Sequence, residues 1–146
     1  MVVEWFALWP LPMPRFENAP SFMPWQLVSY AFLHAGFSHL LFNMLGLAMF
    51  GGEIEAAFGR RRFFQLYFAA VVTGGLAQLI VLKMTGSAPV PTVGASAGVF
   101  GILLAFGLFF PRRIIVLLIP PIPMPAWLFV TFLNPWSSRQ KSMITY

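Results

Sequence analysis

The stretch VGASAGVFG, residues 93–101, holds one hydroxyl group within a run of glycine, alanine and valine. The hydroxyl belongs to Ser96, which could act as the nucleophile of an acyl-transfer reaction. Gly94 and Gly98 lie on either side of it and form a GxxxG pair, a pattern typical of membrane helices that pack closely. The segment alone leaves both interpretations open, because GxSxG is a short motif with two variable positions.

Two further polar residues lie in HAGFSHLLFN, residues 34–43. His39 and Asn43 are four positions apart, so a helix would place both side chains on one face. An imidazole and a carboxamide can both donate hydrogen bonds to a developing oxyanion, and a helix that begins near Ser96 would add backbone N–H donors. Each residue alone has a plainer interpretation: His39 as a packing or interfacial histidine, and Asn43 as a partner for a neighbouring helix.

These residues belong to a chain that is mostly apolar. Of its 146 residues, 59% are hydrophobic and 9% are charged, and the mean hydropathy is +0.80. A soluble domain needs about a quarter of its residues charged, so the composition predicts a membrane protein. The chain has no cysteine, which excludes disulfides and thiolate metal sites. The net charge of +5 comes from short basic clusters beside apolar runs, which orient membrane helices and do not form a nucleic-acid-binding face.

Three segments are predicted to span the membrane. Phe63–Leu82 is uninterrupted and long enough, at about 30 Å of helix, to cross a bilayer. Val93–Phe110 carries no charge and ends sharply at a proline and two arginines, so it is also expected to span. Trp25–Gly52 contains His34, His39 and Asn43, and we expect it to divide into an interfacial part and a span that begins near Phe37.

The two ends of the chain give weaker patterns. Ile114–Leu133 is apolar but contains four prolines, which predicts an extended loop followed by a short helix near Ala126–Leu133. Residues 1–14 have too few apolar residues before their prolines to span, and they lack the features of a signal peptide. The tryptophans are interpreted as membrane-interface anchors: Trp5, Trp9, Trp25, Trp127 and Trp136.

The basic clusters predict the orientation. Arg60–Arg62 precede one predicted span and Arg112–Arg113 follow the next, so both clusters lie on one side, which the positive-inside rule makes cytoplasmic. Glu53 and Glu55 are interfacial charges or partners for Arg60–Arg62. The polar residues singled out above then fall together on the other side: His34, His39, Asn43 and Ser96. The GxSxG pattern also occurs at the strand-to-helix turn of α/β hydrolases, but SAPVPTV before it is not a strand in an alternating α/β chain.

With these residues in place, the chain resembles the rhomboid family of intramembrane serine proteases. The resemblance rests on HAGFSHLLFN at 34–43, GGEIEAAFG at 51–59 and GASAGVFG at 94–101, and it covers about residues 22–127. It implies an all-α, polytopic helical bundle forming a single membrane domain over residues 1–146, with an atypical polar tail at 134–146. It also implies an endopeptidase that cleaves transmembrane segments of other proteins within the bilayer, without cofactor or metal.

The resemblance also assigns roles to residues. Ser96 would be the nucleophile, and His39, Asn43 and the Ser96 backbone N–H would form the oxyanion hole. Gly94 and Gly98 would let helices approach each other, and His34 would have a supporting role.

The departures from the family concern the general base. The family has six spans, of which this chain holds about three to four, and its base is a histidine in the last one. This chain contains only His34 and His39. Lys83 is a poor substitute because it lies beyond a span and across a loop, whereas His34 stays open as an improvised base. We therefore expect the chain alone to be inactive or nearly so.

The alternative function is that of a non-catalytic pseudoprotease or a truncated membrane fragment that binds transmembrane helices. Its partners would be the lipid bilayer and either a second copy of the chain or other rhomboid helices. The small-residue ridge Ala97, Gly101 and Ala105 is expected to lack the helix that packs against it, which would leave it open to lipid or to another chain.

Overall fold

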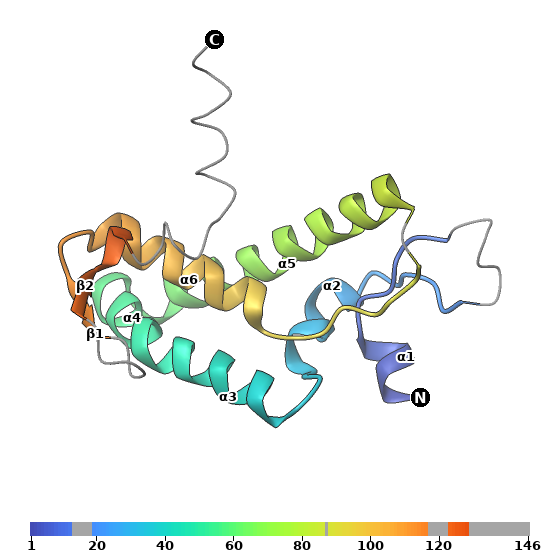
Figure 1. The fold of residues 1–146 in the computed structure, drawn as a ribbon, viewed down its shortest axis with the longest axis horizontal. Coiled ribbons are helices and arrows are strands. Elements are labelled where there is room, and N and C mark those ends of the chain that lie inside the picture. The colour runs from blue at the N-terminus through green and yellow to red at the C-terminus, as the bar shows by residue number, and fades with distance from the viewer. Residues whose placement is uncertain (13–18, 87, 117–122, 129–146) are drawn as a thin grey trace, which may run out of the picture. The chain divides into compact units, whose positions relative to one another are not determined.

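A computed structural model describes residues 1–12, 19–86, 88–116 and 123–128 (Figure 1). The chain divides into two compact units, residues 1–102 and 103–146. The described elements of the first unit are mainly helical: α1 (Val2–Phe6), α2 (Gln26–Ser29), the 3-10 turn η1 (Tyr30–Phe32), α3 (Phe37–Gly46), the π-helical turn η2 (Leu47–Gly51), α4 (Gly52–Phe58) and α5 (Arg60–Thr85). Helix α6 (Ser96–Phe109) begins in the first unit and ends in the second.

Among the described residues, two helical segments are long and apolar enough to cross a membrane. The first is Phe37–Phe58, 22 residues in which α3, η2 and α4 follow one another, and the second is α5 with 26 residues. The predicted division of Trp25–Gly52 is confirmed, because α2 and η1 end at Phe32 and the long helix begins at Phe37. The span predicted at Phe63–Leu82 is also confirmed and is longer by about one turn at each end, since α5 extends from Arg60 to Thr85.

Helix α6 is shorter than the predicted segment Val93–Phe110. It has 14 residues, which correspond to about 21 Å, less than the hydrocarbon core of a bilayer. Gly94 has a φ of +123°, a conformation that excludes it from a right-handed helix, so the helix begins only at Ser96. Pro111 follows at the other end and stops the helix as expected.

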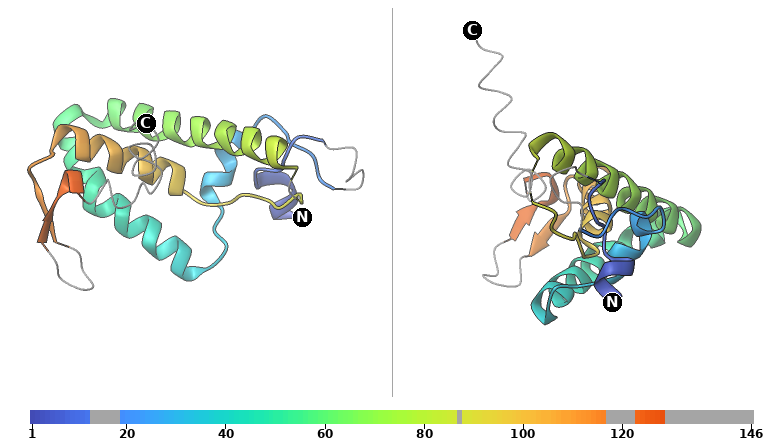
Figure 2. Two further views of the ribbon diagram at one scale, coloured as in Figure 1. Left: turned by 45° about the horizontal axis from the view of Figure 1, so that its top comes forward. Right: turned by 90° about the vertical axis from the view of Figure 1, so that its right-hand side faces the viewer.

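The first half of α6 packs against α5 through small side chains. A methyl group added at Gly74 would lie 2.7 Å from the Ala97 Cβ, and one added at Gly101 would overlap Ala70. The contacts run in opposite directions along the two helices, which are therefore antiparallel (Figure 2). The expectation that the ridge would lack a packing partner was wrong for Ala97 and Gly101, because α5 itself supplies the opposing small residues.

Helix α3 packs on the same half of α6. A methyl group at Gly46 would lie 2.9 Å from the Val99 side chain, and the His39 ring lies against Gly94 just before α6 begins. Residues further along α3 meet residues further along α6, so these two helices are parallel and begin at the same end of the first unit (Figure 2).

The N-terminal segment is held on the bundle by a buried glutamine. Gln26 is fully buried, and its amide oxygen accepts hydrogen bonds from the backbone N–H groups of Trp9 (3.2 Å) and Met23 (3.1 Å). Its Nε2 atom donates to the carbonyl oxygens of Glu4 (3.3 Å) and Trp5 (3.4 Å). Since the side chain uses both its donor and its acceptor atoms, its burial is compensated, and α1 and α2 are fixed against each other.

The predicted acidic partner of the arginine cluster is Glu55. Its Oε1 atom lies 3.7 Å from the Nε atom of Arg60, and both side chains are largely exposed, so the pair contributes little to stability.

The described part of the second unit contains a two-stranded antiparallel sheet. Strand β1 (Ile114–Val116) pairs with β2 (Pro123–Pro125), with Ile115 opposite Met124. We expected an extended loop here, and the strands correct that expectation. Residues 126–128 are helical, in agreement with the predicted start at Ala126, whereas residues 129–133 of the predicted segment and the tail at 134–146 lie outside the described residues.

Candidate active site

The loop before Ser96 is fixed by backbone hydrogen bonds to two distant segments. The Leu8 N–H donates to the Thr92 carbonyl (3.0 Å), and the Thr92 N–H donates to the Leu8 carbonyl (2.9 Å). The Gly94 N–H donates to the Tyr30 carbonyl (2.9 Å). The two residues that flank Val93 are therefore anchored, and they determine where the chain enters α6.

Ser96 is the first residue of α6. The Ala95 carbonyl accepts the Val99 N–H (3.0 Å), so the helical bonding begins at that carbonyl and leaves the N–H groups of residues 96–98 without partners inside the helix. The Ser96 side chain is half-buried, and its hydroxyl makes no hydrogen bond to any residue that the structure describes. The helix start thus places a hydroxyl beside backbone donors and the positive end of the helix dipole.

His39 lies directly against this helix start. A methyl group at Gly94 would lie 2.5 Å from the His39 Cε1 atom and 2.7 Å from Nε2, so the imidazole is in contact with the glycine backbone. Only glycine fits this position, both because of the ring and because of its positive φ. The structure therefore places the His39 ring against Gly94, which precedes Ser96 by two residues.

Asn43 lies one turn further along α3 and is buried, with 6% of its surface exposed. Its Nδ2 atom donates to the carbonyl of His39 (2.9 Å). One amide hydrogen is therefore used within α3, and the second is available to another acceptor. This bond holds the carboxamide on the same face as the His39 ring.

His34 lies beside His39, with ring centroids 5.2 Å apart and planes inclined at 70°. Its Nε2 atom is buried and has no hydrogen-bond partner among the described residues. Desolvation by burial lowers the pKa of His34, and the neighbouring His39 lowers it further, while a hydrogen bond to the Phe32 backbone opposes both effects. The neutral imidazole is thus the favoured form of His34.

Tyr30 is a site residue that the sequence analysis missed. It is 3% exposed, and its hydroxyl donates to the Val71 carbonyl in the middle of α5 (2.7 Å), while its own carbonyl holds Gly94. Burial, followed by the influence of Tyr67, raises the pKa of the Tyr30 phenol to about 12. The signal in the sequence that could have indicated a large neighbour on α5 was the pair Gly74–Gly75. A side chain at Gly75 would lie 3.3 Å from the Tyr30 ring, so glycine leaves room for that ring.

Lys83 does not lie near the serine. The point of α5 that contacts Ala97 is Gly74, and Lys83 follows it by nine residues, which is about 14 Å along the helix axis. Lys83 is exposed in the last turn of α5. Among the described residues, no group of three or more histidine, aspartate or glutamate side chains could hold a metal ion.

Comparisons with known proteins place the chain in a family. The sequence profile of the Rhomboid domain matches residues 21–143. The mitochondrial rhomboid protein 1 of Saccharomyces cerevisiae is 35% identical over 113 residues, which are 77% of this chain and 33% of that protein. The rhomboid protease GluP of Bacillus subtilis is 38% identical over 79 residues, 54% of this chain and 14% of that protein. Human rhomboid-related protein 3 is 37% identical over 81 residues, 56% of this chain and 19% of that protein.

The chain therefore spans a third or less of the length of these relatives. No solved structure matches it significantly. The profile match covers most of the chain and includes all three motifs around His39, Glu53 and Ser96. The chain is a membrane protein of the rhomboid family.

Proposed function

We propose that this chain carries the nucleophile and the oxyanion-binding groups of a serine endopeptidase that cleaves transmembrane segments of other proteins. The observation that carries the proposal is the packing of the His39 ring against Gly94 at the start of the Ser96 helix. A nucleophilic hydroxyl and hydrogen-bond donors from two elements lie at one helix end, which is the arrangement that acyl transfer requires.

The proposed reaction has two steps. The Ser96 Oγ atom attacks the carbonyl carbon of the scissile peptide, its proton goes to a base, and the peptide C–N bond breaks as the amine leaves with a proton. Water then hydrolyses the acyl-serine ester and regenerates the hydroxyl. In both steps the negative carbonyl oxygen would be held by the Ser96 backbone N–H, by His39 and by the free amide hydrogen of Asn43. Gly94 and Gly98 serve this arrangement through close packing on His39 and Tyr67.

No residue of the chain matches the histidine of the last span that serves the family as general base. The chain has two histidines, of which His39 is assigned to the oxyanion, while His34, whose buried Nε2 atom has no partner among the described residues, stays open as an improvised base. An acyl-transfer site without its base retains about 10³–10⁴-fold catalysis over water from the oxyanion hole and binding. We therefore expect these 146 residues alone to react slowly.

The substrate would lie in the membrane. This chain would have the orientation that its arginine clusters predict. Arg60–Arg62 and Arg112–Arg113 would face the cytoplasm of a multi-pass protein in the inner or plasma membrane, and Ser96 would lie near the opposite surface. An apolar cavity of about 360 Å³ adjoins the helix start, between α3 and α5, and reaches His34 and Ala95. It supports a preference for an apolar side chain near the cleaved bond.

A second candidate is a pseudoprotease that binds transmembrane helices without cleaving them. It is favoured by one observation, the presence of only two histidines in the chain. The two functions differ in whether Ser96 forms a covalent bond.

The test uses a fluorophosphonate probe, which reacts with activated serines, on the purified chain in detergent micelles. We expect slow labelling that maps to Ser96, that disappears in Ser96→Ala, and that accelerates when imidazole is added as an external base. His39→Ala should reduce both rates, because the phosphonate oxygen uses the same donors. Ser38→Ala is the matched control, since Ser38 is an exposed serine on α3 that has no role in the proposed reaction. Absence of Ser96 labelling even with imidazole would leave only the helix-binding function.

A further inference from the structure

The loop before Ser96 and the middle of α5 are joined through one residue, Tyr30. Its carbonyl oxygen accepts a hydrogen bond from the Gly94 N–H (2.9 Å), and its hydroxyl donates one to the Val71 carbonyl (2.7 Å). Gly94 precedes the proposed nucleophile by two residues, and Val71 lies in α5, one of the two membrane-spanning helices. A single buried residue therefore connects the entrance of α6 to the helix on which α6 packs.

The Tyr30 ring lies where α5 has two consecutive glycines. A methyl group added at Gly75 would lie 3.3 Å from the Cε1 atom of the ring, and one added at Gly74 would lie 3.7 Å from the hydroxyl oxygen. The methyl group at Gly74 would also lie 2.7 Å from the Cβ atom of Ala97, the residue after Ser96. The Tyr30 hydroxyl and the first turn of α6 thus meet α5 at the same glycine.

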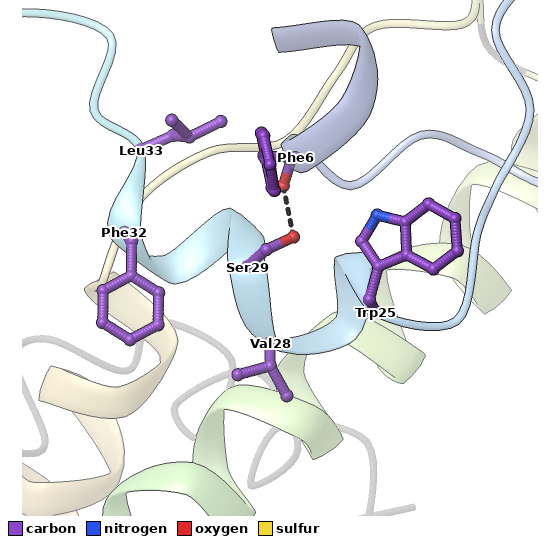
Figure 3. Close-up of a pocket in the computed structure, with 6 residues that line it drawn as sticks. All are labelled: Phe6, Trp25, Val28, Ser29, Phe32 and Leu33. Atoms are coloured by element: carbon purple, nitrogen blue, oxygen red, sulfur yellow. Dashed lines mark hydrogen bonds between the residues drawn. The ribbon is translucent and has the colours of Figure 1, made fainter. Parts of the chain in front are cut away.

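The backbone of Tyr30 is held by bonds that do not involve α5 or α6. The preceding residue, Ser29, donates its hydroxyl hydrogen to the Phe6 carbonyl of α1 (2.8 Å), which Figure 3 shows beside an apolar pocket. The Leu33 N–H donates to the Tyr30 carbonyl (3.2 Å) and closes η1. The Tyr30 carbonyl therefore accepts two hydrogen bonds, one within η1 and one from Gly94.

The Tyr30 hydroxyl is not needed to satisfy α5. The Val71 carbonyl lies inside a regular helix, where the N–H of Gly75 is its partner. The hydroxyl therefore adds a fixed distance between η1 and α5. Burial raises the pKa of the Tyr30 phenol to about 12, so this donor keeps its proton at neutral pH. Without the hydroxyl, η1 and the Gly94 segment bonded to it would be free to shift along α5.

We propose that Tyr30 is a positioning residue, which sets the place of Gly94, and hence of Ser96, against the His39 ring. The inference rests on the proposed function. Tyr30 acts through Gly94, on which the His39 ring packs, and it does not touch the reacting atoms. A shift of Gly94 changes the distance from the Ser96 hydroxyl to the oxyanion donors, and a displacement of about 1 Å at such a site can cost about 10²-fold in rate.

The first test measures the rate of Ser96 labelling by the fluorophosphonate in the full chain, with imidazole as the added base. Tyr30→Phe removes one hydrogen bond and no packing, and it should lower the rate several-fold while the helicity stays unchanged. Thr73→Val is the matched control, because it removes an exposed hydroxyl that also donates to a carbonyl of α5, that of Ala69 (2.8 Å). It should leave the rate unchanged. Equal rates in Tyr30→Phe and in the unaltered chain would overturn the proposal.

A double variant separates positioning from a general structural role. If Tyr30 acts by placing Gly94 against His39, part of its effect is lost once the imidazole ring is removed. Tyr30→Phe should therefore lower the labelling rate by a smaller factor in the His39→Ala background than in the unaltered chain. The same factor in both backgrounds would mean that Tyr30 does not act through this contact.

Hydrogen exchange tests the placement of the loop without the reaction. The Gly94 N–H donates to Tyr30, whereas the Thr92 N–H, two residues earlier, donates to Leu8 (2.9 Å). In Tyr30→Phe the Gly94 amide should exchange several-fold faster relative to the Thr92 amide, measured by NMR on the full chain in micelles. A general loss of stability would accelerate both amides alike, and an unchanged ratio would overturn the proposal.

The outcomes distinguish this proposal from the proposed function. If Ser96 in the unaltered chain is not labelled even with imidazole, the proposed function fails, and the role of Tyr30 in that reaction fails with it. If the unaltered chain is labelled and Tyr30→Phe reacts at the same rate, the proposed function stands and only the role of Tyr30 is refuted.

Discussion

The substitution Gly94→Ala should destabilise the chain more than an alanine at other glycines. Two effects add at this position. The φ of +123° is a conformation that L-residues rarely adopt, which costs about 1–3 kcal/mol. The new methyl group would also lie 2.5 Å from the His39 Cε1 atom, so the ring would have to move from its place beside the helix start. An overpacked contact of this kind costs about 1–3 kcal/mol more.

The chain offers controls that separate these effects. Gly86 has a φ of +60° and open space around its α-carbon, so Gly86→Ala reports backbone strain alone, about 1–2 kcal/mol. Gly36 has extended backbone and open space, so Gly36→Ala should change the unfolding free energy little. The double variant Gly94→Ala/His39→Ala removes the clash and keeps the strain. Its loss of stability should therefore be smaller than the sum of the losses in the two single variants.

The assay is reversible unfolding in mixed detergent micelles, with SDS as the denaturant and helicity as the signal. The expected order of destabilisation is Gly94→Ala above Gly86→Ala above Gly36→Ala. Labelling of Ser96 by the fluorophosphonate should fall in Gly94→Ala even under conditions where the chain stays folded. If Gly94→Ala is no more destabilising than Gly86→Ala, the His39 ring does not lie tightly against Gly94.

Three further changes test other contacts of the first unit. Tyr30→Phe should cost about 0.5–1.5 kcal/mol of unfolding free energy in the same assay, since it removes one buried hydrogen bond to the Val71 carbonyl but leaves that carbonyl its helical partner; no loss would show the bond to be absent. Gly101→Ala should destabilise the chain because Ala70 leaves no room, whereas Gly52→Ala, in open space, should not; equal effects would contradict the packing of α6 on α5. The lowered pKa of His34 means that the unfolded chain binds more protons, so the unfolding free energy should be constant above about pH 6.5 and fall at lower pH, and His34→Gln should flatten this dependence.

The positions of the long helices could be predicted because they depend on local properties of the chain. The length of its apolar stretch predicts α5, and the interruptions at His34, His39 and Asn43 predict that Trp25–Gly52 divides near Phe37. The arginine clusters implied two crossings between them, and this topology correctly brought the starts of α3 and α6 to one end of the first unit. The roles of Ser96, His39 and Asn43 stay predictions, since they concern a reaction.

The contacts that the sequence did not reveal are long-range and involve the backbone. The hydrogen bonds that join Tyr30 to Val71 and Gly94, and those made by Gln26, leave no periodic pattern in the sequence from which they could be predicted. The unpaired ridge was predicted on the assumption that only a missing helix could cover it, whereas Ala70 and Gly74 on α5 already do so. The strand pair in the second unit cannot be predicted from the four prolines of this segment, because proline usually interrupts regular structure and only the outer edge of a strand tolerates it.

The pairing of Leu8 with Thr92 has a consequence for biogenesis. These two residues are separated by both membrane-spanning helices, so the loop before Ser96 cannot reach its final place until α3 and α5 have been inserted. Leu8 is synthesised before Thr92 and can pair with it only once Thr92 has been made. This pairing joins residues more than 80 positions apart in the sequence. The candidate site is thus completed only after both helices are in place, and a bulky group attached next to Leu8 would interfere with this pairing while leaving helix insertion intact.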